Sequence, residues 1–452
     1  MAVLKSINPY DPNRIINYPQ LSDMELKVRL GRSRTAFQDY RKTSFAFRKK
    51  RMERVSTMLR ERNRDLAEII TMEMGKPVRE SVAEVNKCAW VCEYYAENAE
   101  KFLKTRKVQT EAEKSLVLYR PLGPVLAVMP WNFPFWQVFR FAAPALMAGN
   151  TVLLKHASNV QCCAQAIQKL LRYAGFEEGV FQNLAISSDR VAGVIDHEYI
   201  RAVTLTGSEG AGRAVASRAG KNIRKCVLEL GGSNAFVVLN DANLDQALDL
   251  AVPARMQNGG QSCIAAKRFI LESWVAEDFL PRLSGRLDRL TVGDPMQEDT
   301  DLGPLSSVEQ ARLVEKQVSR SVEMGAKLVR GGKRDGAFYD PTILTGVSPG
   351  MPAFDEEVFG PVFAVMEAGS PEHALELSND SRYGLGIQVF TQSEESAGLF
   401  IEGADEGAVF INAMVKSDPR LPFGGVKHSG YGRELSLEGI REFVNVKTVW
   451  IE

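Results

Sequence analysis

Short apolar runs alternate with helical segments from residue 120 onward, and this alternation constrains the fold more than any other feature of the sequence. Helices are predicted at residues 135–149 and in a segment that ends at Gly175. Strands separated by helices at this spacing pair in parallel through right-handed crossovers. The region is therefore predicted to form a doubly wound α/β domain, with strands at residues 124–130, 151–157, 179–186, 199–207 and 225–232.

A second series of apolar runs follows Gly231 and Gly232 and predicts a second α/β domain. Its strands are expected at residues 234–239, 266–272, 361–368, 385–391 and 407–413. Residues 108–119 and 442–452 fit neither series, because apolar and polar residues alternate there as in half-buried antiparallel strands. We therefore predict one domain from residues 1–107 and 120–231, a second from 232–432, and a small β arm from 108–119 and 433–452. About the first 100 residues are expected to form amphipathic helices.

Composition and charge exclude several classes of function for this chain of 452 residues. Its 56 basic residues balance 56 acidic residues, so no net charge attracts nucleic acid or an acidic membrane. The sequence contains neither the ~20 apolar residues of a membrane helix nor a secretory signal pattern. The six cysteines form no CxxC pair and the four histidines are scattered, which argues against a metal site. We expect a cytoplasmic protein without a bound metal.

Three residues have the chemistry and local setting of a catalytic site, and each also has a structural alternative. Cys263 follows two glycines that let the backbone bend sharply, so it is either a nucleophile or an inert buried thiol. Glu229 ends an apolar strand and is either a general base with a raised pKa or a turn residue. Asn132 lies between two prolines and either donates to an oxyanion or forms a turn.

A dinucleotide site is predicted from a glycine-rich turn, although the GxGxxG fingerprint is absent. The segment TGSEGAG, residues 206–212, joins a strand to a helix, where the helix N-terminus can face a pyrophosphate. An acidic residue near a strand end commonly binds the ribose of NAD and repels the phosphate of NADP. Residues 151–176 contain no Asp or Glu, whereas Lys155 and Ser158 follow the second strand. If this region holds the adenosine ribose, NADP is tolerated or preferred.

Taken together, these windows resemble the aldehyde dehydrogenase superfamily, whose motifs occur here in the family's order across nearly the whole chain. The motifs are PWNFP, LLKxA, LTGS at 205–208, LELGG, GQSC, EEVFGPV at 356–362 and PFGGVKHSGYGRE at 422–434. Within the superfamily the chain is similar to short bacterial NAD(P)-dependent succinate-semialdehyde dehydrogenases, especially through GQSCIAAKRF and the FRF at 139–141. The resemblance implies two Rossmann-like domains and a β arm used for oligomerisation.

The resemblance also implies the catalytic roles. Cys263 would attack the aldehyde carbon, and the Asn132 side chain with the Cys263 backbone N–H would hold the oxyanion of the hemithioacetal. Hydride transfer to the nicotinamide would leave a thioester, and Glu229 would activate the water that hydrolyses it. Members that pass the thioester to coenzyme A typically lack this glutamate, so Glu229 favours release of a free acid.

Cofactor contacts follow from the same resemblance, with NADP expected and NAD as the alternative. Lys155 and Ser158 would contact the adenosine ribose, while Gly207 and Ser208 would lie on the pyrophosphate side. Glu357 would hold the nicotinamide ribose. The full set of cofactor residues implied is Trp131, Lys155, Ser158, Gly207, Ser208, Leu230, Glu357 and Phe359.

The substrate assignment rests on Arg140, which follows Trp131 by nine residues, where these enzymes place an arginine for the substrate carboxylate. Trp136 lies four residues before Arg140 and projects from the same helical face. Ser417 is a further candidate for the carboxylate. The alternative for Arg140 is a structural ion pair. Gln257 stands where some relatives carry a second arginine, which leaves room for longer or uncharged aldehydes.

The leading hypothesis is NAD(P)-dependent oxidation of succinate semialdehyde to succinate, by a homodimer or homotetramer. The first alternative is a broad-specificity aldehyde dehydrogenase for other aliphatic aldehydes or semialdehydes. A second is a thiol esterase that uses Cys263 without hydride transfer. Reduction of the nicotinamide distinguishes a dehydrogenase from this esterase. A third is a catalytically silent binding protein, against which the intact Asn132, Glu229 and Cys263 argue.

Overall fold

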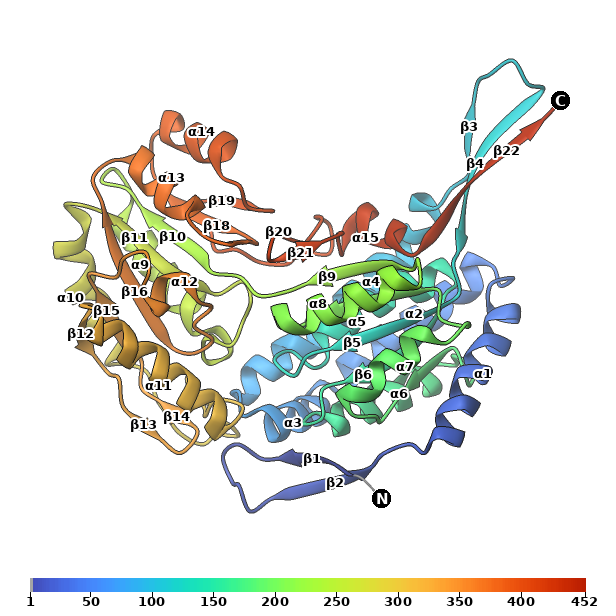
Figure 1. The fold of residues 1–452 in the computed structure, drawn as a ribbon, viewed down its shortest axis with the longest axis horizontal. Helices are drawn as coiled ribbons and strands as arrows, with labels where there is room; N and C mark the ends of the chain where they lie inside the picture. Colours follow the sequence, from blue (N-terminus) through green and yellow to red (C-terminus); the bar gives the residue numbers. More distant parts are fainter. Residues whose placement is uncertain (1–2) are drawn as a thin grey trace.

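The computed structural model describes residues 3–452 and contains two α/β domains from which a β arm projects (Figure 1). The sheet of the first domain has the strand order β21-β9-β8-β5-β6-β7. Its strands are β5 (Pro124–Met129), β6 (Thr151–His156), β7 (Phe181–Asn183), β8 (Ala202–Thr206), β9 (Lys225–Glu229) and β21 (Gly430–Tyr431). Strands β5 to β9 pair in parallel and β21 joins β9 antiparallel. The predicted doubly wound arrangement is therefore confirmed.

The second domain contains a seven-stranded sheet with the order β12-β15-β16-β11-β10-β18-β19. Its strands are β10 (Asn234–Val238), β11 (Ala266–Glu272), β12 (Lys327–Arg330), β15 (Thr342–Thr345), β16 (Val362–Ala368), β18 (Ile387–Phe390) and β19 (Val409–Ile411). All pairs are parallel except β12 with β15. Sequence analysis missed β12 and β15. Most of β12 is exposed at the edge, so it lacks the apolar run by which the other strands were found.

Helices cover both faces of each sheet, and additional β pairs lie in the loops. In the first domain the helices are α1 (Asp23–Tyr40), α2 (Phe45–Glu61), α3 (Asn63–Met74), α4 (Val78–Phe102), α5 (Trp136–Ala148), α6 (Gln161–Tyr173), α7 (Val191–Asp196) and α8 (Glu209–Lys221). In the second they are α9 (Leu244–Met256), α10 (Val275–Leu287), α11 (Val308–Glu323), α12 (Pro352–Asp355), α13 (Pro371–Asn379) and α14 (Glu394–Gly403). The short pairs are β13 (Arg334–Asp335) with β14 (Phe338–Tyr339) and β17 (Tyr383–Gly384) with β20 (Val426–Lys427). No helix within residues 3–452 is long and apolar enough to cross a membrane.

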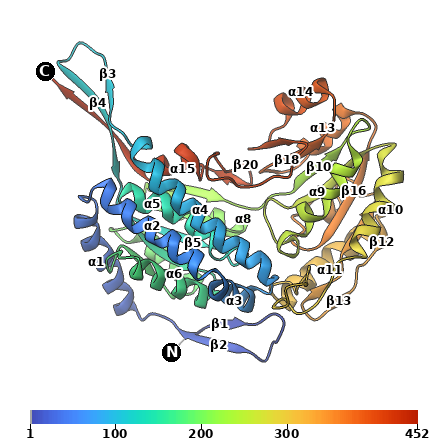
Figure 2. The same ribbon diagram turned by 180° about the vertical axis from the view of Figure 1, so that it is seen from behind.

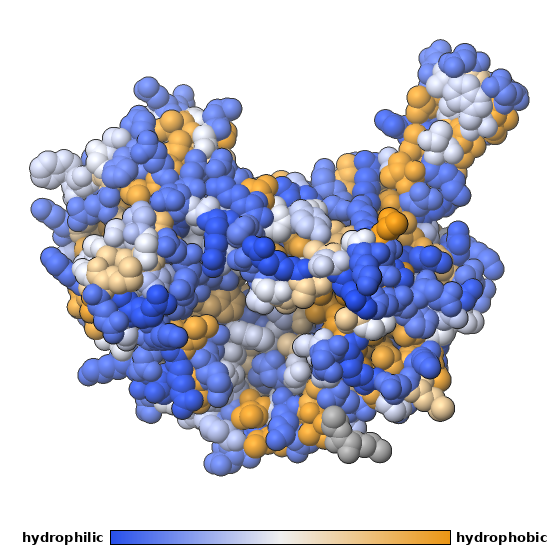
Figure 3. All heavy atoms as spheres, in the orientation of Figure 1, coloured by the Kyte–Doolittle hydropathy of each residue, from blue (hydrophilic) through white to orange (hydrophobic). Residues whose placement is uncertain are grey.

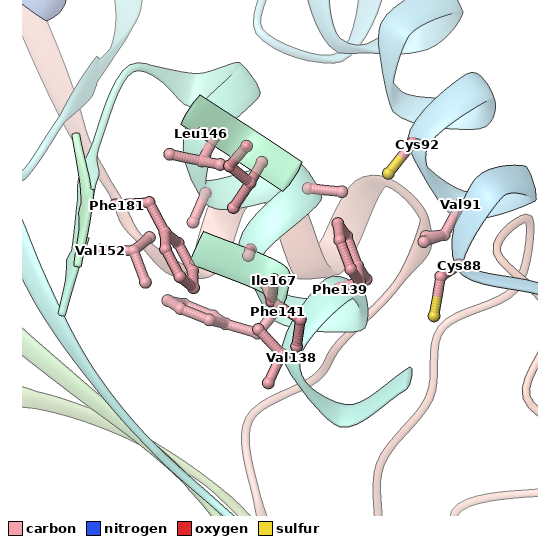
Figure 4. Packing of buried hydrophobic residues seen from close by; sticks show 14 of the residues in the cluster. Cys88, Val91, Cys92, Val138, Phe139, Phe141, Leu146, Val152, Ile167 and Phe181 are labelled. Carbon is pink, nitrogen blue, oxygen red and sulfur yellow. The ribbon is translucent and has the colours of Figure 1, made fainter. Parts of the chain in front are cut away.

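The largest hydrophobic core joins α4 and α5 to the sheet of the first domain. Figure 2 shows α2, α4 and α6 on the rear face of this sheet, whereas α7 and α8 lie on the front face in Figure 1. Every residue of α5 is buried. In Figure 4, Cys88 and Cys92 of α4 lie beside Phe139 of α5, and both thiols are fully buried. These cysteines pack as small apolar side chains.

The N-terminal segment corrects the expectation that the first hundred residues are helical. Strands β1 (Val3–Ile7) and β2 (Ile15–Pro19) form an antiparallel hairpin before α1 begins. The pattern was too short to detect, because Leu4, Ser6 and Tyr18 are the only buried residues of the two strands. Ser6 Oγ donates to the backbone oxygen of Asn159, which fixes the hairpin on the first domain.

The arm consists of β3 (Arg106–Val108), β4 (Lys114–Pro121) and β22 (Val444–Ile451) in the order β22-β4-β3. All its pairs are antiparallel, as the alternating pattern predicted. The C-terminal part of the arm is shorter than the predicted residues 433–452, because α15 (Ser436–Glu442) packs on α4 and α5. Leu435 and Ile440 are buried there. The division of the whole chain into domains remains a prediction.

Candidate active site

The predicted site residues of the first domain lie at the carboxyl ends of its parallel strands. Trp131 and Asn132 follow β5, Lys155 is near the end of β6, Ser208 follows β8, and Glu229 ends β9. The strand order runs from β5 to β6 and β7 in one direction and from β5 to β8 and β9 in the other. In doubly wound sheets, ligands bind outside the carboxyl ends at such a reversal of strand order. The sheet topology therefore brings separate sequence motifs to one binding region.

Cys263 follows a backbone turn that is held in an unusual conformation. Asn258, Gly259 and Gly260 have φ angles of 57°, 62° and 76°. A side chain at Gly260 would overlap the backbone oxygen of Gly360, so this position requires glycine. The turn places Cys263 between α9 and β11, where it lines a cavity of about 450 Å³ together with Trp136 of α5.

The Cys263 side chain rests as a protonated thiol, because its pKa is raised. Burial raises its pKa to about 11, and the positive charges of Arg140 and Lys267 oppose this effect. The thiolate is the reactive form. At neutral pH the resting group is therefore a thiol that must transfer its proton to a base or water before it attacks a carbonyl.

Glu229 is buried in the same region, with 2% of its surface exposed. Its Oε1 atom has no hydrogen-bond partner within residues 3–452. Burial raises its pKa well above the usual range, the Arg140 guanidinium opposes the shift, and Glu434 adds to it. A carboxyl group with a raised pKa is a stronger base once ionised, and can take a proton from water.

Gly424 of the PFGG motif makes room for the Glu229 carboxylate. A Cβ atom at Gly424 would stand 2.7 Å from Oε1 of Glu229. The following residues of the motif pair with β9, with Gly430 opposite Glu229. The C-terminal motif therefore forms one wall around this glutamate.

Asn132 is tied to the loop that carries the nucleophile. Its Nδ2 donates to the backbone oxygen of Gln261 at 3.1 Å, and Asn258 Nδ2 donates to the backbone oxygen of Asn132 at 2.7 Å. Because Nδ2 carries two hydrogens, one remains for another acceptor. The bond to Gln261, two residues before Cys263 in the sequence, holds the Asn132 amide against the nucleophile loop, and its oxyanion role remains a prediction.

Glu357 and Lys267 connect the predicted nicotinamide ribose site to the nucleophile loop. Glu357 Oε1 accepts the backbone N–H of Gly232 at 3.1 Å and lies 3.1 Å from Lys267 Nζ. Lys267 Nζ also donates to the backbone oxygens of Ser262 and Cys263, each at 2.8 Å. Sequence analysis missed Lys267. The only available signal was its position four residues after Cys263 in the GQSC window.

The remaining predicted cofactor residues surround the same region. The rings of Trp131 and Phe359 meet edge to face with centroids 5.7 Å apart. Leu230 packs closely against Gly212 of α8. A Cβ atom at position 212 would stand only 2.6 Å from Cδ1 of Leu230, so a larger residue there would clash. Gly207 follows β8, and Ser208 accepts the N–H of Ala211 as the N-cap of α8. A helix N-terminus at a strand end suits a pyrophosphate, so these residues fit a dinucleotide.

Lys155 and Ser158 lie at the end of β6, where the adenosine ribose is expected. Lys155 Nζ donates to Ser188 Oγ at 3.1 Å, and burial lowers the pKa of the lysine. Asp189 also acts on Lys155, because its charge opposes that shift. Asp189 lies outside residues 151–176, and the fold brings it close to Lys155 from the 3-10 turn at residues 188–190 that follows β7.

Arg140 lines the cavity and also forms the structural ion pair that was its alternative assignment. Its Nε faces a carboxylate oxygen of Glu434. The Arg140 side chain is 2% exposed and the Glu434 side chain is 3% exposed. Its Nη2 lies 3.5 Å from Thr206 Oγ1, and its guanidinium carbon lies 4.5 Å from the Phe423 ring centre. Arg140 is therefore not an isolated cation awaiting substrate. Its contact with substrate remains a prediction.

Trp136 and Ser417, the other predicted substrate residues, line the same cavity. A residue that sequence analysis missed contacts both of them. Lys87 of α4 donates to Ser417 Oγ at 2.8 Å, and its Nζ lies 4.3 Å from the Trp136 ring centre. The N-terminal N–H groups of α5 donate to Glu84, which fixes Trp136 in place. Lys87 belongs to no recognisable motif, so no sequence signal pointed to it.

Comparisons with known proteins agree with the geometry. Residues 2–449 match the aldehyde dehydrogenase family. The chain is 49% identical to a probable NADP(+) succinate-semialdehyde dehydrogenase of Synechocystis over 99% of both chains. It is 44% identical to an NAD(P)+ succinate semialdehyde dehydrogenase of Escherichia coli, covering 98% of this chain and 97% of the relative.

Solved structures give the same result. Succinic semialdehyde dehydrogenase from Streptococcus pyogenes, in complex with NADP+, superposes with a TM-score of 0.97 at 39% identity, over 99% of both chains. The family resemblance and the fold class predicted from the motifs are confirmed. This chain belongs to the aldehyde dehydrogenase family.

Proposed function

We propose that this enzyme oxidises succinate semialdehyde to succinate with NADP+. One observation carries the proposal: a single cavity contains the Cys263 thiol, the Arg140 guanidinium and the Ser417 hydroxyl. A nucleophile and carboxylate-binding groups in one cavity suit an aldehyde that carries a carboxylate. The names of the Synechocystis and Escherichia coli relatives support the same substrate.

The chain's own residues divide the reaction among them. Cys263 passes its proton to Glu229 or to water and its sulfur attacks the aldehyde carbon, while Asn132 Nδ2 and the Cys263 backbone N–H donate to the resulting oxyanion. Bound NADP+ supplies the hydride acceptor. Glu229 then takes a proton from the water that attacks the thioester. The carbon–sulfur bond breaks, the sulfur remains on Cys263 as a thiolate, and the carboxylic acid is released. The raised pKa of Glu229 makes it suitable for this step.

NADP+ is proposed as the preferred cofactor because of Lys155 and Ser158. A lysine at the adenosine ribose can pair with a 2′-phosphate, whereas a glutamate there would repel it. Asp189 is exposed and close enough to act on Lys155. Its carboxylate weakens the attraction of Lys155 for a 2′-phosphate, so NAD+ is expected to bind as well. Trp131, Gly207, Ser208, Leu230, Glu357 and Phe359 are proposed to complete the cofactor site.

We propose a homodimer or homotetramer assembled through the β arm. Val446, Trp450 and Ile451 of β22 are 58%, 45% and 43% exposed, and Figure 3 shows hydrophobic atoms along the sides of the arm. An edge strand with exposed apolar side chains is suited to pairing with another chain. Light scattering of the purified protein tests the assembly, and a monomer would reject it.

Initial rates of cofactor reduction test the function. Succinate semialdehyde and butyraldehyde are each supplied with NADP+ and with NAD+. We expect the highest kcat/KM with the semialdehyde and NADP+. Comparable values for butyraldehyde would favour the broad-specificity alternative, which Gln257 on the cavity wall supports. Hydrolysis of p-nitrophenyl acetate without any cofactor reduction would favour the esterase.

A further inference from the structure

Among the cations that line the active-site cavity, Lys87 combines partial burial with the lack of an acidic partner within residues 3–452. Arg79 pairs with Asp301, and Arg140 pairs with Glu434. Lys416 also forms no ion pair within the described residues, but it is exposed to solvent. Lys87 is half-buried and forms no ion pair within the described residues 3–452.

Neutral groups hold the Lys87 ammonium at the cavity wall. It donates to Ser417 Oγ at 2.8 Å and lies 4.3 Å from the centre of the Trp136 ring. An ammonium group has three hydrogens, so two remain after the bond to Ser417. The serine hydroxyl accepts from Lys87 and keeps its own hydrogen for another acceptor. Both groups can therefore donate to one anion.

The surroundings of Lys87 leave its charge incompletely compensated. Burial lowers its pKa to about 8, and the positive charge of Arg140 acts in the same direction. Glu84 and Asp418 oppose the shift without reaching ion-pair distance. Glu84 is already engaged with Lys76 and the N-terminus of α5. A partly desolvated cation gains most from an anion that enters the cavity.

We infer that Lys87 is a specificity-determining residue that binds the carboxylate of the substrate together with Ser417. Gln257, in the wall of the same cavity, leaves the position of a second arginine neutral. Lys87 supplies a second positive charge from α4, an element distant in sequence from both Arg140 and Ser417. The inference rests on the proposed function, since it requires a substrate with a carboxylate.

Substitution of Lys87 tests the inference with matched aldehydes. The Lys87→Met variant removes the charge and keeps an unbranched side chain, whereas Lys87→Arg keeps the charge. Three substrates are compared with NADP+: succinate semialdehyde, its neutral amide analogue and butyraldehyde. Because charge-assisted hydrogen bonds are involved, we expect kcat/KM for the semialdehyde to fall about 10- to 100-fold in Lys87→Met. The two neutral aldehydes should change little, and Lys87→Arg should recover part of the loss.

Two control variants locate the effect. Lys101→Met makes the same change on an exposed turn of α4 and should leave all three rates unaltered. Lys416→Met removes an exposed cation of the cavity and should have a smaller effect than Lys87→Met. An equal loss in Lys416→Met would assign the preference to general positive charge and overturn the role of Lys87. Equal losses for charged and neutral aldehydes in Lys87→Met would do the same.

A second measurement uses the wild-type protein in case both variants fold poorly. Acetylation of Lys87 by acetic anhydride is followed by mass spectrometry of its peptide, with succinate or the neutral amide butyramide present. Succinate should protect Lys87 and butyramide should not, and equal protection would overturn the inference. A wild-type enzyme without preference for the semialdehyde would instead reject the proposed substrate. Retained preference in Lys87→Met would reject the role of Lys87 alone.

Discussion

Removal of Arg140 is predicted to affect stability and the general base as well as substrate binding. Arg140 and Glu434 are 1% and 3% exposed, and Glu229 nearby is 2% exposed. The Arg140→Met variant would leave two buried carboxyl groups beside each other without their cation. Removal of one partner from a buried ion pair typically costs about 3–5 kcal/mol. We expect a loss of this size in the free energy of unfolding at neutral pH.

The double variant Arg140→Met, Glu434→Gln separates the ion pair from other roles of the arginine. Replacing both members of a buried pair by neutral groups is often nearly neutral for stability, so most of the loss should be recovered. Urea unfolding is followed by tryptophan fluorescence and by circular dichroism. A single variant as stable as wild type, or a double variant as unstable as the single one, would refute the reasoning.

The single variants Arg140→Met and Glu434→Gln are expected to shift the pH dependence of thioester hydrolysis in opposite directions. Arg140 lowers the pKa of Glu229 and Glu434 raises it. A general base acts in its unprotonated form, so a higher pKa requires a higher pH for activity. The acid limb should move to higher pH in Arg140→Met and to lower pH in Glu434→Gln, with butyraldehyde as substrate. If the acid limb moved in the same direction in both variants, the opposite effects of Arg140 and Glu434 on the pKa of Glu229 would be contradicted.

Three further predictions concern the proposed reaction. Cys263→Ala should abolish turnover while NADP+ still quenches tryptophan fluorescence; surviving dehydrogenase activity would remove its assignment as nucleophile. Glu229→Gln should give a stopped-flow burst of reduced cofactor and then stall as a thioester visible by mass spectrometry, whereas unchanged steady-state turnover would exclude it as the base. Because the pKa of Lys87 is about 8, its charge is lost as pH rises through that value. The KM for succinate semialdehyde should therefore rise above pH 8 more steeply than the KM for butyraldehyde, and equal rises would contradict this.

Strands with continuous apolar runs could be predicted from the sequence, because their burial leaves a local pattern. Strands β5 and β6 are examples, with almost every side chain buried. Strand β12 could not be predicted, since three of its four residues are exposed and its position depends on pairing with β15. The hairpin of β1 and β2 is similar, because its stability comes from contacts such as the bond between Ser6 and Asn159.

The candidate site shows the same division between local motifs and long-range contacts. Cys263, Glu229 and Asn132 lie in motifs whose glycines and prolines impose a particular backbone, so the residues could be proposed from sequence. Lys87 reaches Ser417 across a separation of 330 residues. No spacing rule relates positions so far apart, and a helix with many charged residues gives no reason to single out one lysine.

Glu434 shows how a residue can be part of a recognised motif and still have no assigned role. It is the last residue of PFGGVKHSGYGRE, yet its pairing with Arg140 depends on where that segment crosses the first domain. Strand β21 pairs with β9, and this pairing carries the end of the motif past Glu229 toward α5. The arginine proposed for the substrate and the glutamate proposed as base are therefore linked through a third charged residue. For this reason, a loss of activity in an Arg140 variant cannot by itself identify a substrate contact, whereas its comparison with the Glu434 variants can.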